Sequence, residues 1–220
     1  MSPGQLGILG GTGPAGSALG VRLASVGFDV VIGSRSKYRA MEVVDKLHEK
    51  WGDRHLPIAA GDNAAAAAAD VVVIATPWDA AYGTATSVAE ALDGKVVICM
   101  ANALTRIGNE FQPLVPPRGS VAASVQAAVP GCRVAAAFHH VPAKELGDLS
   151  HPIESDVLIC SDFQDATDVT SDIVAKVPNM RPLDAGGLSQ ATPIESFTAV
   201  LLQLNVHYNT RVAVKFTGIP

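Results

Sequence analysis

The chain has 220 residues, 48% of them hydrophobic and 17% charged, which suits one large domain or one domain with a small addition. Its formal net charge of −5 argues against nucleic acid as the main partner. No apolar run reaches the roughly 18 residues that a membrane-spanning helix needs, so we expect no membrane partner.

The cysteines and the N-terminus indicate the compartment. Cys99, Cys132 and Cys160 are widely spaced and lie in apolar, strand-like runs without metal-ligand spacing. This pattern favours free thiols in a reducing cytoplasm over a disulfide framework. The N-terminus lacks the basic flank and apolar segment of a secretory signal. No histidine, cysteine or acidic residues recur at ligand spacing, so no metal site is expected.

Residues 6–32 predict a strand, a glycine-rich turn, a helix and a second strand. The apolar run at 6–9 is long enough for a buried strand, and the turn at 11–16 has the pattern G-x-G-x-x-G. Apolar residues at helical spacing follow as far as Val26, and 28–32 is apolar again. A dinucleotide-binding turn requires this context, and the alternative is an ordinary tight turn.

Each glycine of this turn has an expected role. Gly11 permits the tight turn, Gly13 lets the backbone approach a pyrophosphate, and Gly16 lets the helix pack closely on the sheet. The N-terminus of the helix then offers free N–H groups to the anion.

The loop after the second strand indicates which dinucleotide is bound. An NAD enzyme usually has an acidic residue there, which accepts a hydrogen bond from the ribose 2′-hydroxyl. Here the strand runs into Gly33-Ser34-Arg35, followed by Lys37 and Arg39, and no acid stands at the tip. A hydroxyl and two or three cations suit a 2′-phosphate, so the sequence favours an NADP site over a solvated basic turn.

The remaining chain alternates strands and helices, which predicts an α/β fold: a Rossmann-type doubly wound parallel sheet with right-handed crossovers. Residues 104–120 contain three prolines and are expected to be irregular. The last helix is apolar at nearly every turn, so it is expected to be buried in the domain or against a partner subunit. The expected helices lie at 40–51, 64–69, 80–92, 121–129, 166–177 and 194–206, and the strands at 56–60, 71–75, 96–100, 133–138, 156–160 and 181–187.

Ligands of such a sheet bind outside the carboxyl ends of its strands. Besides the glycine turn and the basic loop, we expect loops at 76–78, 101–102 and 139–143 on this side. Trp78 is either a wall of the nicotinamide pocket or a packing residue at the start of a helix. His139 directly ends a strand here and is interpreted as functional, whereas His140 is interpreted as capped or exposed.

Six segments carry a resemblance to a known family. They are GGTGPAG (10–16), IGSRSKYRA (32–40), ATPWDA (75–80), AAFHHVPA (136–143), RPLDAGGLS (181–189) and PIESFTAVLLQLN (193–205). Together they resemble the coenzyme F420-dependent NADP oxidoreductases, from near residue 6 to the end of the chain. The resemblance implies an NADP-binding Rossmann domain at 1–138. It also implies a small C-terminal α+β addition at 139–220, which binds the substrate and forms a homodimer through the last helix.

The resemblance, combined with these loops, gives two sets of expected contacts. In the family, a threonine, a serine and two cations hold the 2′-phosphate, and the nicotinamide carboxamide lies near the loops at 101–102 and 143. The expected cofactor-binding residues are Gly11, Thr12, Gly13, Pro14, Ala15, Ser34, Arg35, Arg39, Thr76, Pro77, Asn102 and Ala143. The expected substrate-binding residues, on the deazaflavin side, are Trp78, His139, Val141, Pro142, Ser196 and Thr198.

The implied reaction is reversible hydride transfer between C4 of the nicotinamide and C5 of the 5-deazaflavin coenzyme F420. The two cofactors carry the chemistry, and the protein supplies position and electrostatics. We therefore expect no catalytic acid, base or metal, with His139 positioning the ring. Thr192 stands where some members carry arginine, which leaves the contact to the coenzyme tail open. The stretch 100–120 also differs from the family pattern, and its role is open.

Two other functions remain open at this point. A reductase of the pyrroline-carboxylate or β-hydroxyacid type usually needs a larger helical substrate domain with a lysine or paired acids, and no such cluster follows the sheet. An NADP-binding sensor without catalysis needs only the nucleotide site. The polar positions at Ser196–Thr198 and the loop at His139 favour a second ligand, and hence an enzyme.

Overall fold

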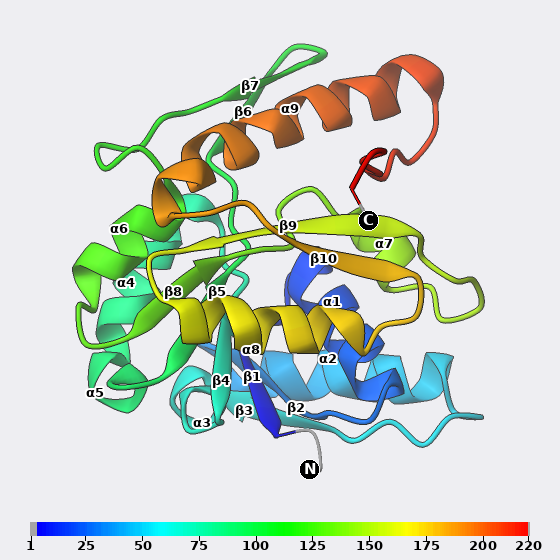
Figure 1. Ribbon diagram of the computed structural model, residues 1–220. Coiled ribbons are helices and arrows are strands. Elements are labelled where there is room, and N and C mark those ends of the chain that lie inside the picture. The colour runs from blue at the N-terminus through cyan, green and yellow to red at the C-terminus, as the bar shows by residue number, and fades with distance from the viewer. Residues whose placement is uncertain (1–3, 220) are drawn as a thin grey trace.

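The computed structural model describes residues 4–219 and contains an eight-stranded sheet, a two-stranded hairpin and flanking helices (Figure 1). The strands are β1 (Gln5–Leu9), β2 (Asp29–Ser34), β3 (Ile58–Asp62), β4 (Val71–Ile74), β5 (Val96–Cys99), β6 (Leu104–Ile107), β7 (Glu110–Pro113), β8 (Arg133–Ala136), β9 (Ser155–Ser161) and β10 (Met180–Asp184). The helices are α1 (Pro14–Ser25), α2 (Lys37–Lys50), α3 (Asn63–Ala67), α4 (Trp78–Ser87), α5 (Ala89–Leu92), α6 (Val121–Ala128), α7 (Ala143–Leu146), α8 (Gln164–Ala175), the 3₁₀ turn η1 (Leu188–Gln190) and α9 (Ala191–Tyr208).

The large sheet has the strand order β10-β9-β8-β5-β4-β1-β2-β3. β1 lies between β2 and β4 and is parallel to both, with Leu6 opposite Val30 on one side and Val71 on the other. The strand order therefore reverses beside β1, and a sheet of this type binds ligands at such a switch point. The expected Rossmann-type α/β fold is confirmed.

The strands β9 and β10 run against the other six, and they lie in the part of the chain, 139–220, where a small α+β addition is expected. Ala135 and Ala136 of β8 pair antiparallel with Ser161 and Cys160 of β9. A parallel connection needs a crossover that is usually a helix lying on one face of the sheet, but only the four-residue α7 stands between these strands. The chain therefore turns back at the carboxyl edge and extends the same sheet. The division of the chain at residue 138 stays a prediction.

The sequence predicts an irregular segment at 104–120, but the structure forms the antiparallel hairpin β6–β7 there. Leu104 pairs with Pro113, so this proline lies at the end of a strand. The loop is Gly108-Asn109, and Gly108 has a φ of +60°, the left-handed conformation that tight hairpin turns need. This Gly-Asn pair is the hairpin signal, and the nearby prolines obscured it.

The predicted single helix at 80–92 is broken at Val88 into α4 and α5. Near the break, Thr86 Oγ1 donates a hydrogen bond of 2.9 Å to the carbonyl oxygen of Tyr82. Side-chain bonds of this kind compete with the helical backbone pattern and bend helices. A run of threonine, serine and valine therefore ended a helix that the apolar spacing alone predicted to continue.

Hydrophobic side chains fill both faces of the sheet. Leu6, Ile8 and Ile98 pack on the face that α1, α2 and α8 cover, and Leu9 and Val97 pack on the face that α3 to α6 cover. This division follows from the alternation of side chains along a strand. The three cysteines are free, and they are buried on the face that α3 to α6 cover. Among residues 4–219 no helix has the length and apolarity to cross a membrane.

The helix α9 lies over the carboxyl edge of the sheet, beside the hairpin (Figure 1). Gln203 Oε1 accepts a hydrogen bond of 3.3 Å from the backbone N–H of Phe111 in β7. The segment after α9 returns to the sheet, where the Asp156 carboxylate accepts bonds of 2.6 Å from the N–H of Phe216 and 2.7 Å from Arg181. The edge that binds ligands in this fold is thus covered by elements from the end of the chain.

Candidate functional site

The glycine turn after β1 is shaped by backbone contacts that leave no room for side chains at two positions. A Cβ atom on Gly11 would lie 2.9 Å from the carbonyl oxygen of Ile8. A Cβ atom on Gly16 would lie 2.8 Å from the Gly11 Cα and 3.0 Å from the Ala75 Cβ, so α1 approaches the sheet very closely there. A Cβ atom on Gly13 would come no nearer than 3.6 Å to a described protein atom. The absence of a side chain at Gly13 therefore keeps space open for a ligand.

The N-terminus of α1 faces this open space with free donors. Gly13 is the N-cap and Pro14 follows it, and no described side chain caps the helix or places an acid in its first turn. The first N–H groups of a helix have no acceptor within the helix itself. A negatively charged group beside Gly13 would satisfy these donors and interact favourably with the helix dipole.

The turn opens into a cavity of about 250 Å³, which we call the nucleotide cavity. Its wall contains the expected cofactor residues Thr12, Gly13, Ser34, Arg35, Arg39, Thr76 and Pro77. The sequence prediction omitted Gly10, Asn63, Ala75, Ala80 and Thr84, which also line it. Asn63 follows Asp62 at the start of an alanine-rich helix, and its Oδ1 accepts a 3.4 Å hydrogen bond from the N–H of Gly10. The sequence offered one sign that Asn63 lines the cavity: it is an asparagine at a strand-to-helix junction on the ligand-binding edge of the sheet.

The rim of the nucleotide cavity is basic. Arg35 and Arg39 are exposed, and neither forms an ion pair with any residue of 4–219. The acid nearest in register is Asp62, opposite Ser34 on the neighbouring strand, but its carboxylate accepts a 2.8 Å bond from the N–H of Ala65 and so caps α3. The rim thus offers free cations to a phosphate. The carboxylate of Asp62 is already engaged as the cap of α3.

A residue with a buried hydroxyl also lines this cavity. Thr76 is 9% exposed, and its Oγ1 has no hydrogen-bond partner in the part of the chain that the structure describes. A buried polar group without a partner is unfavourable. Pro77 is the N-cap of α4, so the strand-to-helix junction brings both residues to the wall.

Three expected contacts, distant in sequence, meet beneath α9. Asn102 Nδ2 donates a hydrogen bond of 2.9 Å to the carbonyl oxygen of His139. Thr198 Oγ1 donates to the same carbonyl at 3.2 Å and lies 3.3 Å from Asn102 Oδ1. The loops after β5 and β8 are thereby joined to each other and to α9. The expected residues Val141 and Ser196 lie nearby in sequence, the first buried and the second half-buried.

The two histidines after β8 are both buried and neutral. His139 is 4% exposed, and burial, with a smaller effect of His140, lowers its pKa to about 3. Neither ring nitrogen of His139 has a hydrogen-bond partner among residues 4–219. His140 is 3% exposed, which contradicts its interpretation as a capped or exposed residue. Its Nε2 accepts a 3.2 Å bond from the N–H of Leu158, because β9 turns back over this loop.

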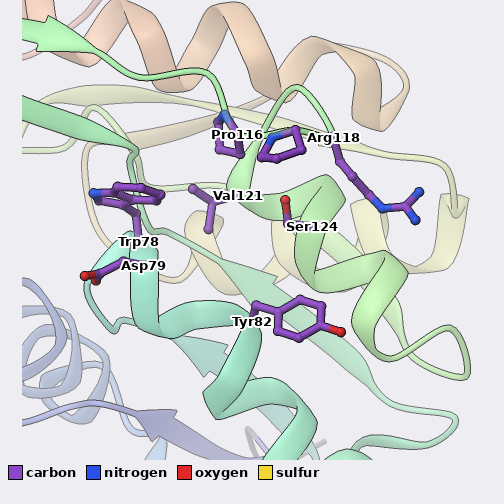
Figure 2. Close-up of a pocket in the computed structure, with 8 residues that line it drawn as sticks. Trp78, Asp79, Tyr82, Pro116, Arg118, Val121 and Ser124 are labelled. Carbon is purple, nitrogen blue, oxygen red and sulfur yellow. The ribbon is translucent and has the colours of Figure 1, made fainter.

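The helix α4 separates the nucleotide cavity from a second one. Ala80 and Thr84 line the nucleotide cavity, whereas Trp78 and Tyr82, on another face of the helix, line a cavity of about 320 Å³ between α4 and α6. Figure 2 shows this α4–α6 cavity, with Pro116 and Val121 on the wall opposite the tryptophan. Trp78 is therefore the wall of a cavity, although not of the nucleotide cavity.

A third cavity, of about 670 Å³, lies between α7, α9 and the segment that follows α9. Two expected contacts, Pro142 and Ala143, belong to its wall, together with Leu202 and Asn205 of α9. We call it the α7–α9 cavity. The expected substrate residues thus divide between the α4–α6 cavity, the α7–α9 cavity and the buried cluster of Asn102, His139 and Thr198.

A buried carboxylate that the sequence prediction missed fixes the start of α9. Glu195 is 4% exposed and accepts hydrogen bonds from the N–H groups of Val121 (2.9 Å) and Ala122 (3.1 Å), at the N-terminus of α6. Burial raises its pKa to about 7, although these two bonds favour the charged form. Because Thr198 lies one turn further along α9, this contact positions the cluster beneath the helix.

The described residues contain no group of three or more histidine, cysteine or acidic side chains that could hold a metal ion. The switch-point turn, the basic rim and the free donors together define a Rossmann-type protein of the NADP-binding class.

Comparisons with known proteins identify the family. A family model described as NADP oxidoreductase, coenzyme F420-dependent, matches residues 5–103. The F420-dependent NADP reductase of Methanothermobacter marburgensis is 34% identical, with 98% of this chain and 99% of the relative covered. The protein of the same name from Methanocaldococcus jannaschii is also 34% identical, with 98% and 96% covered. The chain belongs to the coenzyme F420-dependent NADP oxidoreductase family.

A solved structure extends the comparison to the fold. A protein from Arthrobacter sp. FB24, whose name proposes an F420-dependent NADP reductase, superposes with a TM-score of 0.79 at 22% identity. The match covers 96% of this chain and all of that one. The C-terminal strands and α9 therefore belong to an arrangement that this structure shares over nearly its full length.

Proposed function

We propose that the chain catalyses reversible hydride transfer between NADP(H) and the 5-deazaflavin coenzyme F420. The observation that carries the proposal is that two cavities lie on either side of α4, at the carboxyl edge of the sheet. The helix α4 contributes to both cavities: Ala80 and Thr84 line the nucleotide cavity, and Trp78, the residue after Pro77, lines the α4–α6 cavity. The name of the relatives, F420-dependent NADP reductase, supplies the identity of the second ligand.

NADP fits the turn and the basic rim. The space at Gly13 and the free donors of α1 suit the pyrophosphate, and Arg35 and Arg39, with the Ser34 hydroxyl, suit the 2′-phosphate. Thr76 and Pro77 line the wall of the same cavity, beyond the turn. When bound, the nicotinamide gives or accepts the hydride at its C4.

The chain's own part on the substrate side is to hold position. Asn102 and Thr198 fix the carbonyl of His139, and this keeps the loop from 139 to 143 in place under α9. His139 is neutral at pH 7 because burial lowers its pKa to about 3, so it carries no proton to donate as an imidazolium. Hydride transfer between two held rings needs orientation rather than a general base.

The test is a direct assay of hydride transfer. We expect the protein to bleach oxidised F420 at its deazaflavin absorbance maximum when NADPH is supplied, and to reduce NADP⁺ with reduced F420. Bleaching should be much slower with NADH. Tight NADPH binding without bleaching above a control that lacks protein would overturn the proposal, and would favour a sensor or a reductase of another substrate.

We also propose a homodimer formed through α9. Phe197, Val200 and Tyr208 are 37%, 52% and 67% exposed, and with Leu204 they form one apolar stripe along the helix. Leu201 is buried within the chain, so it cannot contribute to this stripe. Val200→Asp should shift the sedimentation of the protein from dimer to monomer without unfolding it. A wild-type monomer at micromolar concentration would contradict this proposal.

We further propose that the protein works in the cytoplasm. Its three thiols are free and buried, which suits a reducing compartment. Fractionation of cells that express the protein should place it with cytoplasmic markers, and recovery with an oxidising compartment would contradict this.

A further inference from the structure

The helix α1 reaches from the nucleotide cavity to the loop of the substrate side. At its start, Gly13 lines the nucleotide cavity and Pro14 is the first helical residue. In its last turn lies Arg22, roughly 13 Å further along the helix axis. The helix α7, which begins at Ala143 in the loop of the substrate side, lies beside α1 (Figure 1). One rigid element therefore touches both sides of the proposed site.

The contact between α1 and α7 is close. Their first residues, Pro14 and Ala143, line one cavity of about 270 Å³, as do Ala18 and Gly147. A Cβ atom on Gly147 would lie 3.2 Å from the Cβ of Ala18 and 3.4 Å from the carbonyl oxygen of Ala143. The first distance is shorter than the optimal separation of about 3.5–4.0 Å between two carbons. The glycine thus lets the two helices approach each other by a few tenths of an ångström more than an alanine would.

Arg22 holds the end of α7 against α1. Its side chain is 7% exposed, and its Nε donates a 3.0 Å hydrogen bond to the carbonyl oxygen of Leu146. Its Nη2 donates to the carbonyls of Glu145 at 2.8 Å and Asp148 at 2.6 Å. The last carbonyls of a helix have no donor within the helix, and a guanidinium interacts favourably with their partial negative charge. A single side chain therefore satisfies three acceptors and fixes where α7 ends.

The other end of this loop is held by different residues. Asn102 and Thr198 donate to the carbonyl of His139, at 2.9 Å and 3.2 Å. Just before it, Phe138 is 1% exposed and has a φ of +65°, a conformation that a residue with a side chain keeps only when its surroundings enforce it. The loop from 139 to 148 is thus fixed at its start by the sheet and α9, and at its end by α1.

We propose that Arg22 is a positioning residue for the hydride transfer. It keeps α7, and with it the loop from 139 to 143, at one separation from the helix that receives the nucleotide. The contact of Gly147 with Ala18 sets how near the two elements come, and Arg22 holds them there. The inference rests on the proposed function, because this separation matters to a reaction only if the nucleotide must meet a second ring. A displacement of about 1 Å can cost about 100-fold in rate, so a few tenths of an ångström should cost several-fold.

The first test widens the contact and keeps every hydrogen bond of Arg22. Gly147→Ala adds a methyl group against Ala18, and its φ of −82° is one that alanine adopts without strain. Ala18→Gly is the matched partner, because it removes the methyl group that the new one would meet, and it should cost about 1 kcal/mol of stability. The double variant restores the space. Single-turnover hydride transfer is measured with both ligands saturating, and Kd values for NADPH and F420 are measured separately.

We expect Gly147→Ala to slow hydride transfer by about three- to five-fold. The isotope effect of NADPH deuterated on its transferred face should persist, and both Kd values should stay within about two-fold of wild type. Ala18→Gly should keep the wild-type rate although it is less stable. The double variant should recover the rate to within about two-fold of Ala18→Gly alone. Rate and melting temperature would then change independently, which a merely structural role does not allow.

The second test changes Arg22 itself and includes a measurement without ligands. Arg22→Lys keeps the charge but loses the planar fork that reaches several carbonyls at once. Well below its melting temperature it should transfer hydride about ten-fold more slowly than wild type, and amide hydrogen exchange of 139–148 should be faster in the free protein. Arg54→Lys is the control, because Arg54 is exposed and gives only one 3.0 Å bond to the carbonyl of Leu149. It should match wild type in both measurements.

Several results would overturn the inference. A wild-type hydride rate in Gly147→Ala would mean that the contact does not set the distance between the rings. A double variant that stays slow would place the loss within α7 rather than between the helices. An unchanged rate in Arg22→Lys, with faster exchange of the loop, would show that the position of the loop does not limit the reaction.

The failure of the proposed function has its own signature. If wild type binds NADPH but transfers no hydride to F420, that function fails and the inference fails with it. If wild type transfers hydride, and Gly147→Ala and Arg22→Lys do so at the same rate, the function stands and the inference alone is rejected.

Discussion

The two ligand sides of the molecule are built in different ways. The nucleotide side is open: Arg35 and Arg39 have no ion-pair partners among residues 4–219, and the start of α1 has free donors. The substrate side is closed: Asn102 and Thr198 use their polar groups on the carbonyl of His139, beneath α9.

This difference indicates that the nucleotide side provides affinity for the ligand and that the substrate side holds the loops in position. On the nucleotide side the two arginines and the first N–H groups of α1 have no partners within the described chain, so they are available to the ligand. A substitution there should weaken binding and leave the fold intact. On the substrate side the polar groups satisfy one another and hold three distant segments together. A substitution there should first change stability or geometry, and only through them the reaction.

The largest effect is expected where α1 holds the loop of the substrate side. Arg22 is 7% exposed and donates to the carbonyls of Leu146 (3.0 Å), Glu145 (2.8 Å) and Asp148 (2.6 Å). Arg22→Met should lower the free energy of unfolding by about 3–5 kcal/mol, because it leaves several buried acceptors without a donor. Guanidinium unfolding measures this loss.

A matched control tests whether the burial of Arg22 matters. Arg54 is an exposed arginine that donates a single 3.0 Å bond to the carbonyl of Leu149 in the same loop region. Arg54→Met should cost about 1 kcal/mol or less. Equal losses for the two variants would show that the loop is not held chiefly through α1.

The second effect depends on pH and concerns Glu195. Burial raises the pKa of this carboxyl to about 7, above its ordinary value, so the folded state keeps a proton that the unfolded state loses. The stability that Glu195 contributes is therefore fully present below about pH 4.5 and is lost as pH rises through about 7, by about 3 kcal/mol in total. Glu195→Gln cannot ionise and should lack this decline.

Unfolding of wild type and of the glutamine variant at pH 5, 6, 7 and 8 measures the effect. The advantage of wild type over Glu195→Gln should shrink with pH across this range. A growing advantage would mean that the N–H groups of Val121 and Ala122 outweigh burial and lower the pKa of the carboxyl. In that case Glu195 would stabilise α6 as a charged cap.

The third effect lies on the open side and should touch binding alone. A charge-assisted hydrogen bond contributes about 1.5–3 kcal/mol, so Arg35→Ala should weaken NADPH binding by roughly 10- to 150-fold. NADH, which has no 2′-phosphate, should be affected much less. Lys37→Ala is the matched control, because Lys37 is exposed at the start of α2, two residues from Arg35, and does not line the cavity. Equal losses for NADPH and NADH at Arg35 would reject the 2′-phosphate assignment.

How much could be predicted from sequence follows the same division. The nucleotide side rests on contiguous residues: the turn at 11–16 and the loop at 34–39 carry their own signals of glycine spacing and charge. The chain order of strands and helices then placed the turn at the switch point. Local physics decides these features, so a single sequence was enough to predict the fold and the basic rim.

On the substrate side, individual residues could be predicted from the sequence, but their contacts with one another could not. Asn102 and His139 are 37 residues apart and Thr198 lies 59 residues beyond His139, and nothing local in the sequence says that they touch. The cap that Glu195 places on α6 spans 74 residues and was missed for the same reason. The direction of β9 also depends on how the chain turns after β8, which no periodicity records.

The smallest effect is expected at His139, although it lies nearest the proposed chemistry. Burial lowers its pKa to about 3, so at pH 7 it has no imidazolium proton to give, and neither ring nitrogen bonds to a described residue. General acid–base catalysis typically contributes 10²–10⁴-fold, so a true proton donor would show a loss of at least about 100-fold. We therefore expect His139→Ala to lower turnover by clearly less than about 100-fold, through the placement of the deazaflavin ring and its affinity.

Single-turnover measurements with NADPH deuterated on its transferred face separate binding from the hydride step, and the isotope effect should persist. Thr198→Val, which removes the bond to the His139 carbonyl and keeps the side-chain volume, should likewise raise KM more than it lowers the hydride rate. A loss near 1000-fold at His139, with the isotope effect abolished, would assign that residue to the chemistry itself.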